Sequence, residues 1–218
     1  MQQEKPEEGV RMKRITIVGC GPGSRLHATG SALQTIEQAD VLIGARRLLD
    51  EFGKGKRSIP YRSVDDTLAI LHTNKNEGVA VLVTGDPGFF SITACIIREF
   101  GIKNVTVVPG ISSMTYAFSR LGIPWQDALF LSAHKEMPPD FSNTISVSKK
   151  IGILTSPIYT VSRCAAAMRL TNPARYRFFV GMRLSYPDEN LGEYAFEKVC
   201  GMDTGDLSVL IVLQREEK

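Results

Sequence analysis

The stretch Ile15–Arg25, with the sequence ITIVGCGPGSR, runs from an apolar segment directly into three glycines and a proline. A short apolar run that ends in such residues predicts a buried strand followed by a tight turn. Gly19 and Gly21 carry no Cβ, so the backbone of this turn can approach another group closely. In a parallel sheet, such a turn lies at the carboxyl edge, where ligands bind in open α/β folds.

The turn departs from the dinucleotide-binding pattern G-x-G-x-x-G. In Gly19–Ser24, GCGPGS, the third glycine comes one position early, and Pro22 lacks the backbone N–H that a pyrophosphate needs. The nearby acid Asp40 begins the second expected strand instead of ending it, so no acid is placed to hold a ribose. The pattern disfavours a phosphate nest and leaves open a tight turn that holds no ligand.

Strands and helices alternate through the first half of the chain, as in a parallel sheet covered by helices. We expect strands over residues 14–18, 40–44, 78–84 and 104–108, helices over 28–39, 45–52, 63–74, 91–100 and 112–121, and a basic loop over 53–60. Ser63 and Asp66 have the spacing of a capping box at the third of these helices.

The second half has a different pattern. We expect strands over 128–133, 151–155, 177–184, 194–200 and 206–213, a helix over 159–170 and a loop over 134–149. Short connections join the last three strands, which favours antiparallel pairing. We therefore predict an α/β protein with an N-terminal domain over 14–122, built on a parallel Rossmann-like sheet, and a C-terminal mixed α/β domain over 126–218. Residues 1–13 are expected to be a flexible lead-in.

The composition of the 218 residues is that of an ordinary globular protein, with 43% hydrophobic and 22% charged residues. The net charge of +3 is too small to indicate nucleic-acid binding. The four cysteines form no CxxC pair and have no metal-ligand spacing with histidine, which argues against a metal site and a disulfide scaffold. Such cysteine usage, without an apolar signal region or a membrane-spanning stretch, predicts a cytoplasmic protein.

Two more loops rich in glycine and proline follow expected strands in the first half. They are Thr84–Phe90, TGDPGFF, and Pro109–Ser113, PGISS. Asp86 is the only carboxylate in them, and it either accepts hydrogen bonds from its own turn or binds a polar group of a ligand. Ser112 and Ser113 either cap the next helix or offer hydroxyl and N–H groups to a ligand. Loops of this kind suit a cofactor held by main chain better than acid–base or nucleophilic catalysis.

Five stretches, taken in chain order, resemble those of the tetrapyrrole methylases, the class III S-adenosylmethionine-dependent methyltransferases: IVGCGPGS, QADVLIGARRLL, VTGDPGFFS, VVPGISS and LSYPDE. The stretches GARRLL and FLSAHK are most similar to the members that methylate C5 of cobalt-precorrin-7 or precorrin-7 in cobalamin biosynthesis. The chain departs from the family at Met182 and Arg183, because relatives often have Glu and Asn immediately before LSYPDE. The resemblance implies a C-methyltransferase that acts on a corrin precursor.

The resemblance also implies S-adenosylmethionine as the cofactor. By motif position, the residues that bind it are Gly85, Asp86, Phe89, Ser112 and Ser113, with Met182 from the second domain. The sequence assigns no catalytic acid, base or nucleophile and no metal ligand. This agrees with a sulfonium donor, which is already activated for methyl transfer.

The implied substrate is an anionic tetrapyrrole with many carboxylate groups. By motif position Pro22 lies near it, and His134, which follows a strand at the domain junction, is a second candidate. Arg25 and Lys135 are candidates for pairing with the substrate carboxylates, and the alternative for each is a solvated surface charge.

The resemblance also implies a homodimer, since dimers are usual in the family. It further implies that a separate enzyme, which methylates C15 and decarboxylates, could act on the same substrate series. No nucleic acid and no membrane is expected as a partner.

Three alternative functions stay open. The first is another class III methylase, which acts on a different tetrapyrrole position, on the diphthamide precursor or on ribosomal RNA. The second is a Rossmann-like nucleotide-binding oxidoreductase, which Pro22 disfavours. The third is a non-catalytic scaffold, which three glycine-rich loops on one sheet edge disfavour.

Overall fold

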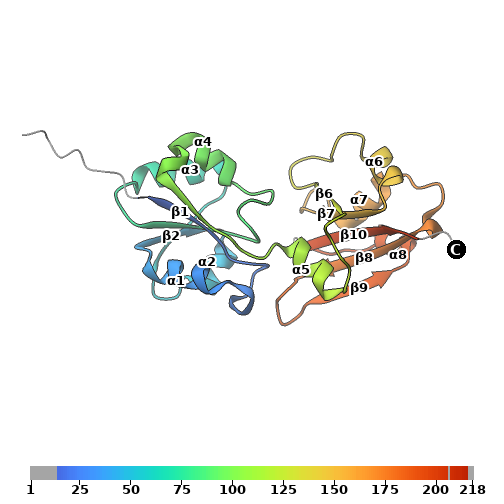
Figure 1. Ribbon diagram of the computed structural model, residues 1–218, viewed down its shortest axis with the longest axis horizontal. Coiled ribbons are helices and arrows are strands. Elements are labelled where there is room, and N and C mark those ends of the chain that lie inside the picture. Colours follow the sequence, from blue (N-terminus) through green and yellow to red (C-terminus); the bar gives the residue numbers. More distant parts are fainter. Residues whose placement is uncertain (1–13, 206, 216–218) are drawn as a thin grey trace, which may run out of the picture. The chain divides into compact units, whose positions relative to one another are not determined.

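The computed structural model describes residues 14–205 and 207–215. The chain divides into two compact units, residues 1–111 and 112–218, each built on a five-stranded sheet (Figure 1). The division comes before helix α5 (Ser113–Arg120), because α5 packs on the second sheet. The boundary expected at residues 122–126 comes after this helix, since the sequence shows α5 in regular alternation with the strands that precede it.

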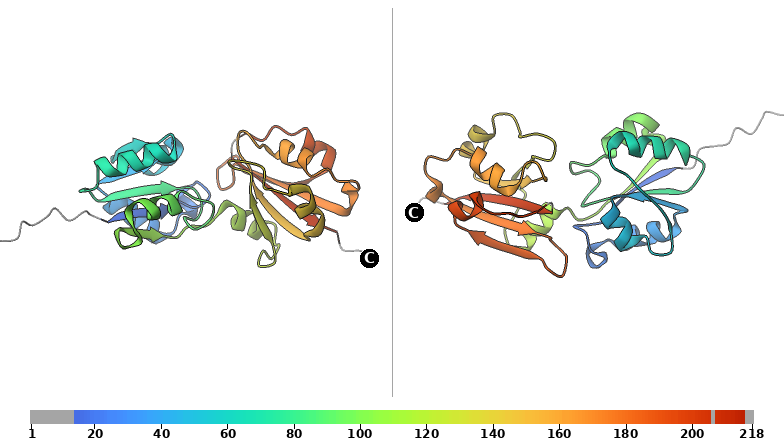
Figure 2. Two further views of the ribbon diagram at one scale, coloured as in Figure 1. Left: turned by 90° about the horizontal axis from the view of Figure 1, so that it is seen from above. Right: turned by 180° about the vertical axis from the view of Figure 1, so that it is seen from behind.

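The first unit is a parallel sheet with the strand order β3-β2-β4-β1-β5. Its strands are β1 (Ile15–Gly19), β2 (Val41–Gly44), β3 (Arg57–Pro60), β4 (Val79–Val83) and β5 (Val105–Val108), with a 3-10 turn, η2 (Ile102–Asn104), before β5. One face is covered by α1 (Gly30–Gln38) and α2 (Arg46–Phe52), and the other by α3 (Val64–Thr73) and α4 (Thr93–Phe100) (Figures 1 and 2). The expected helix-covered parallel sheet is confirmed.

The carboxyl ends of β1 and β4 form the topological switch point of this sheet. The two strands are neighbours, and their register runs from Thr16 opposite Ala80 to Gly19 opposite Val83. After β1 the chain passes to α1 on one face, and after β4 it passes to α4 on the opposite face (Figure 1). Connections that diverge from neighbouring strands in this way mark the ligand-binding edge of open α/β sheets.

Alternate residues of the strands face the two helical layers. On β1, Ile15 and Ile17 belong to a buried cluster with Ile96 of α4, whereas Val18 belongs to a cluster with Leu48 of α2. Because both faces of the sheet are covered, the inner strands β2 and β4 are apolar and buried along their whole length, and β1 nearly so, instead of alternating between apolar and polar residues. This explains why the opening stretch runs apolar up to its first glycine.

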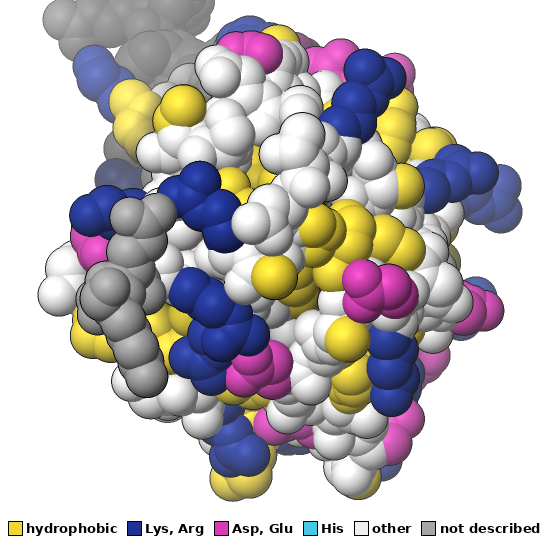
Figure 3. Space-filling view, turned by 90° about the vertical axis from the view of Figure 1, so that its right-hand side faces the viewer, with side chains coloured by type: hydrophobic (Ala, Val, Ile, Leu, Met, Phe, Trp, Pro, Cys, Tyr) yellow, Lys and Arg dark blue, Asp and Glu magenta, His cyan; other side chains and the backbone are white. Residues whose placement is uncertain are grey.

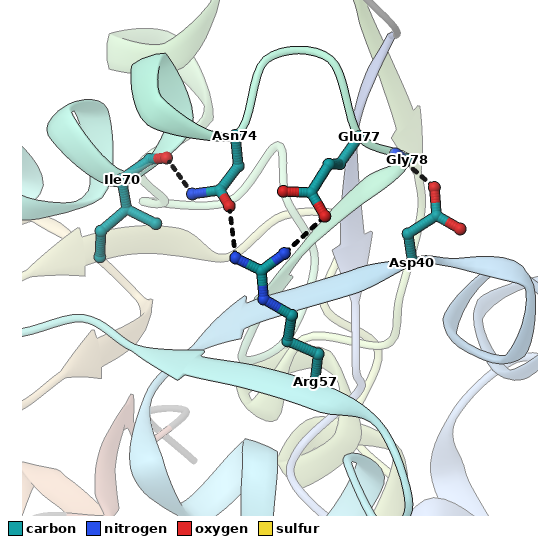
Figure 4. A network of polar contacts seen from close by, with 6 residues as sticks. All are labelled: Asp40, Arg57, Ile70, Asn74, Glu77 and Gly78. Atoms are coloured by element: carbon teal, nitrogen blue, oxygen red, sulfur yellow. Dashed lines mark hydrogen bonds and ion pairs between the residues drawn. The ribbon is translucent and has the colours of Figure 1, made fainter.

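A polar network ties together the amino edge of the same sheet (Figure 4). Arg57, at the start of β3, donates to Glu77 Oε2 at 2.5 Å and to Asn74 Oδ1 at 3.0 Å. The N–H of Gly78, just before β4, donates to Asp40 Oδ2, just before β2, at 2.8 Å. These bonds hold the starts of three strands, at the edge opposite the glycine-rich loops.

The second unit is a mixed sheet with the strand order β6-β7-β10-β8-β9. Its strands are β6 (Leu129–Ser132), β7 (Lys150–Leu154), β8 (Tyr176–Met182), β9 (Asn190–Tyr194) and β10 (Ser208–Gln214), with a 3-10 turn, η3 (Pro173–Arg175), before β8. Among the described residues of this unit, β6 and β7 are the one pair of strands that run in parallel. Helices α6 (Phe141–Val147), α7 (Val161–Ala167) and α8 (Phe196–Cys200) pack on the face that holds Ile151 and Ile153, and α5 packs on the other, where Met114 lies against Gly152.

Two expected loops contain regular structure, so these expectations are wrong. Residues 53–60 include β3, an edge strand with largely exposed, partly charged side chains that ends in Pro60. An edge strand of this kind lacks the apolar pattern of a buried one. Residues 134–149 include α6, whose buried residues Phe141 and Ile145 lie one turn apart. Its remaining residues are mostly Ser, Thr and Asn, which are weak helix formers.

The strand expected over residues 194–200 is also wrong. Strand β9 ends at Tyr194, and α8 follows at Phe196–Cys200. Apolar residues at 194, 196 and 199 match a strand in their first half and a helical turn in their second, and periodicity cannot separate the two over so short a segment. The predicted antiparallel pairing is confirmed, because β8 pairs antiparallel with both β9 and β10, and β10 lies between β7 and β8.

Candidate functional site

The first two glycine-rich loops contact each other at the switch point of the first sheet. The N–H of Gly85 donates to the carbonyl of Gly21 at 2.7 Å, and the two residues form an isolated antiparallel bridge. The N–H of Cys20 donates to the carbonyl of Val83 at 2.9 Å, which extends the β1–β4 pairing into the loops. Both Gly21 and Gly85 have positive φ, at 71° and 74°, a conformation that favours glycine.

The third loop joins this contact through Gly110. A Cβ on Gly110 would lie 2.4 Å from the carbonyl oxygen of Gly85 and 2.7 Å from the carbonyl carbon of Gly19. A Cβ on Gly19 would lie 2.6 Å from the N of Gly110. Backbone atoms therefore fill the space that side chains would need, and the three loops form one main-chain surface at the carboxyl edge.

Asp86 fastens the second loop to the third. Its Oδ1 accepts the N–H of Gly88 at 2.7 Å, within its own turn. Its Oδ2 accepts the N–H of Gly110 at 3.1 Å, twenty-four residues further along the chain. The carboxylate thus has the turn-forming role that the sequence suggested and a second role that the sequence did not reveal.

The other first-unit candidates surround these loops. Pro22 is buried, and Phe89 is half-buried with its ring 4.8 Å from that of Phe90 in an edge-to-face arrangement. Arg25 begins a 3-10 turn, η1 (Arg25–His27), and its side chain is exposed. The guanidinium carbon of Arg25 lies 5.6 Å from the ring centre of Phe52, so the cation rests on α2.

Arg47 is a residue at this edge that the sequence analysis did not single out. It lies in the first turn of α2, is half-buried, and donates through Nη2 to Thr84 Oγ1, directly before Gly85. Burial raises the pKa of the nearby Tyr61, and the positive charge of Arg47 opposes that rise. The sequence feature that could have pointed to Arg47 is the pair of arginines in GARRLL, directly after β2. Ligands of open α/β sheets bind at the carboxyl ends of the strands, so charged residues there are candidates for a site.

Cys20 lies inside the first loop but is not an available nucleophile. Its side chain is fully buried, and burial raises the pKa of the thiol to about 12, with Arg47 opposing the rise. A thiol that keeps its proton at neutral pH is unreactive, since the thiolate is the reactive form. The cysteine therefore packs beneath the loop as a small apolar residue.

In the second unit, Ser112 and Ser113 begin α5. Ser112 is buried, and its Oγ accepts the N–H of Thr115 at 3.0 Å, so it caps the helix. Ser113 is the first residue of α5 and is half-buried. The capping interpretation of Ser112 is confirmed.

The remaining candidates lie where strands of the second sheet end. The carboxyl ends of β6, β7 and β8 share one edge, because β7 and β8 both pair antiparallel to β10. Met182 ends β8 and packs half-buried against the core of this unit. His134 and Lys135 follow β6 and are exposed, and the N–H of His134 donates to Ser132 Oγ at 3.3 Å.

Over residues 14–205 and 207–215, no group of three or more His, Cys, Asp or Glu side chains is arranged to hold a metal ion. No helix among the described residues is long and apolar enough to span a membrane.

The fold and the loops define a class: an α/β protein of two units, in which backbone from three glycine-rich loops meets at the carboxyl edge of a parallel sheet. Residues 14–199 match the family described as Tetrapyrrole (Corrin/Porphyrin) Methylases. The chain belongs to this family.

Two relatives carry the name of one reaction. A cobalt-precorrin-7 C(5)-methyltransferase of Salmonella typhimurium is 34% identical over 122 residues, which cover 55% of this chain and 61% of the relative. The match thus spans about three fifths of that protein's length. A probable cobalt-precorrin-7 C(5)-methyltransferase of Methanocaldococcus jannaschii is 27% identical over 211 residues, which cover 93% of this chain and 99% of the relative.

A solved structure shows the same fold. Uroporphyrin-III C-methyl transferase from Thermus thermophilus, complexed with S-adenosyl homocysteine, superimposes with a TM-score of 0.73. It is 20% identical, and the match covers 91% of this chain and 96% of that one.

Proposed function

We propose that the protein is an S-adenosylmethionine-dependent C-methyltransferase that acts on a corrin precursor in cobalamin biosynthesis, at C5 of cobalt-precorrin-7 or precorrin-7. The observation that carries the proposal is the match over nearly the whole chain to a relative named for this reaction. The backbone-built edge at the switch point supports it, because such an edge suits a cofactor held by main chain.

Methyl transfer between these two reactants needs no catalytic acid, base or nucleophile to activate them. The donor is a sulfonium, and the acceptor is an electron-rich carbon of a conjugated macrocycle. A bond forms between the methyl group and this carbon, the sulfur–methyl bond breaks, S-adenosylhomocysteine leaves, and the acceptor carbon loses its proton. Holding the two reactants in line supplies roughly 7–11 kcal/mol of the barrier reduction. Rigid loops locked by Gly85, Gly110 and Asp86 are suited to that task.

For the donor we propose Gly85, Asp86, Phe89, Ser112, Ser113 and Met182 as binding residues. Asp86 acts mainly by holding the second and third loops together, since both of its oxygens accept backbone N–H groups. The N–H and hydroxyl groups at the start of α5 are further donors and acceptors for a polar cofactor.

For the substrate we propose Pro22, Arg25, His134 and Lys135. Arg25 and Lys135 are exposed cations, able to pair with the acetate and propionate groups of a corrin precursor. We infer a small anionic substrate instead of RNA. On the face shown in Figure 3, Lys and Arg side chains are interspersed with Asp and Glu instead of forming one basic field.

We propose that the protein works in the cytoplasm as a homodimer, beside a separate enzyme that methylates C15 and decarboxylates. Light scattering tests the dimer: one chain has a mass of 24.0 kDa, so a dimer has twice that mass.

Calorimetric titration with S-adenosylhomocysteine tests the donor site, with NADH as the parallel ligand. We expect one-to-one, micromolar binding of the first and no binding of the second. Asp86→Ala should weaken the binding about tenfold, the effect of ~1.4 kcal/mol, because the second and third loops lose their tie. Asp50→Ala, which removes an exposed carboxylate on α2, is the matched control and should bind as the unsubstituted protein does. Binding of NADH alone would contradict the proposal and support the oxidoreductase.

A further inference from the structure

The turn that follows β8 has an unfavourable backbone conformation. In residues 183–189, RLSYPDE, both Arg183 and Ser185 have positive φ, at 47° and 72°. Residues with a Cβ avoid this left-handed region because the Cβ crowds the following carbonyl oxygen. Two such residues in one turn persist only where the surrounding structure holds them in place.

The carboxylate of Glu189 supplies that support. Its Oε2 accepts the N–H of Ser185 at 2.6 Å, across the turn. The same oxygen accepts the hydroxyl of Tyr116 at 2.7 Å, and Oε1 lies 3.4 Å from Nη2 of Arg120. The side chain of Glu189 is 15% exposed, whereas that of Arg120 is 60% exposed, so the two hydrogen bonds to Glu189 Oε2 are the better shielded contacts.

These contacts join two elements that both carry candidate donor-binding residues. Tyr116 and Arg120 lie one turn apart on α5, the helix that begins with Ser112 and Ser113. The turn 183–189 follows Met182 directly, at the end of β8. Glu189 therefore ties the turn 183–189, which follows Met182, to α5 within the second unit.

We propose that Glu189 is a positioning residue for the methyl donor: it holds the turn 183–189 against α5, so that Met182 and the start of α5 keep the spacing that donor binding requires. The inference rests on the proposed function. Binding groups placed by a rigid support lose less free energy on binding than groups that must first be ordered. The carboxylate does not act on the reacting atoms.

The same turn provides a matched control. Asp188 is adjacent in sequence, and its Oδ2 accepts from Nε of Arg183 at 2.5 Å. Both partners lie within the turn, and both are largely exposed. Asp188→Asn therefore removes a carboxylate and an ion pair from the turn without cutting its tie to α5.

The experiment compares four variants by calorimetric titration with S-adenosylhomocysteine, at a temperature where circular dichroism shows each to be folded. Glu189→Ala should raise the dissociation constant about tenfold, the effect of ~1.4 kcal/mol. Glu189→Gln should recover part of the loss, because its amide oxygen still accepts a hydrogen bond. Tyr116→Phe should show an intermediate loss, and Asp188→Asn should show none. In turnover assays the KM for the donor should rise in Glu189→Ala while the KM for the tetrapyrrole stays unchanged.

The outcomes separate this inference from the function on which it rests. If the unsubstituted protein binds S-adenosylhomocysteine and Glu189→Ala binds it equally well, with only a lower Tm, Glu189 merely stabilises the fold and the inference is overturned alone. An equal loss in Asp188→Asn would overturn it as well, because the tie to α5 would not be the cause. If the unsubstituted protein does not bind the ligand, the inference and the proposed function are overturned together.

Discussion

Gly110 shows at the scale of one residue why the loops of the first unit depend on glycine. The position has no space for a side chain, since the atoms nearest to a Cβ are backbone atoms of Gly85 and Gly19. A flexible side chain can move away from a new methyl group, but paired backbone cannot do so without breaking its hydrogen bonds. The sequence showed that glycines recur in three loops, but it could not show that they pack against one another.

Gly110→Ala should therefore lower the free energy of unfolding by about 1–3 kcal/mol, the usual effect of overpacking. The midpoint of urea unfolding, followed by a probe of the first unit, measures the change. Gly30→Ala is the control, because a Cβ on this first residue of α1 meets nothing within 4 Å. It should be neutral or stabilise by up to roughly 0.5–1 kcal/mol. Equal effects of the two substitutions would contradict the packing account.

Cys20 makes stability depend on pH in the alkaline range. Burial raises the pKa of its thiol from 9.0 to about 12. Between these values the unfolded chain loses the thiol proton while the folded chain keeps it, so the free energy of unfolding falls as pH rises. The fall due to this group approaches about 1.4 kcal/mol per pH unit.

Cys20→Ala should remove this part of the pH dependence. Urea unfolding measures the free energy of unfolding of both proteins at pH values from about 8 upward, in steps of roughly half a unit. The slope of this free energy against pH is then compared between the two proteins. Cys95→Ala, which leaves Cys20 in place, should keep the steeper fall. If Cys20→Ala and the unsubstituted protein lost stability in parallel above pH 9.0, the thiol would not be buried in the way described.

Among the helices and strands, the sequence predicted those that have a clear apolar pattern of their own. Four of the five strands of the first sheet, β1, β2, β4 and β5, are mostly apolar runs and were expected within one or two residues. The cap of α3 was also expected: Ser63 Oγ accepts the N–H of Asp66 at 3.1 Å. The elements that the sequence did not predict were β3, α6, β9 and α8, which are all short. Their structure depends on neighbouring elements instead of on a pattern of their own.

The end of α7 offers a test at this scale. Arg169 follows the helix with a φ of 49° and an exposed side chain, at a position where glycine or asparagine is usual. Arg169→Asn should raise the free energy of unfolding by about 0.5–1 kcal/mol, because asparagine tolerates the left-handed conformation better than arginine. Thermal unfolding measures the gain as a higher Tm. Arg163→Asn, inside the same helix, is the comparison and should be destabilising. A lower Tm for Arg169→Asn would contradict the assignment of backbone strain.

At the scale of the whole molecule, strand order decides where chemistry can occur. The sequence predicted the fold class, because repeated strand–helix units permit few topologies. It could not predict that β1 and β4 would be neighbours, since that pairing joins segments about 60 residues apart. For the same reason the sequence could not predict two contacts between distant segments. These are the hydrogen bond between Asp86 and Gly110 and the position of Arg47 beside Thr84. Motif resemblance supplied the candidate residues, and the structure supplied the contacts among those of each unit.

We propose that this chain transfers a methyl group from S-adenosylmethionine to C5 of a corrin precursor. The most direct measurement is incubation of the protein with methyl-labelled S-adenosylmethionine and cobalt-precorrin-7, or its metal-free form, followed by mass spectrometry and carbon NMR of the product. We predict a single added methyl group, located at C5. A methyl group at another ring position, or no transfer by a protein that binds S-adenosylhomocysteine, would contradict the account.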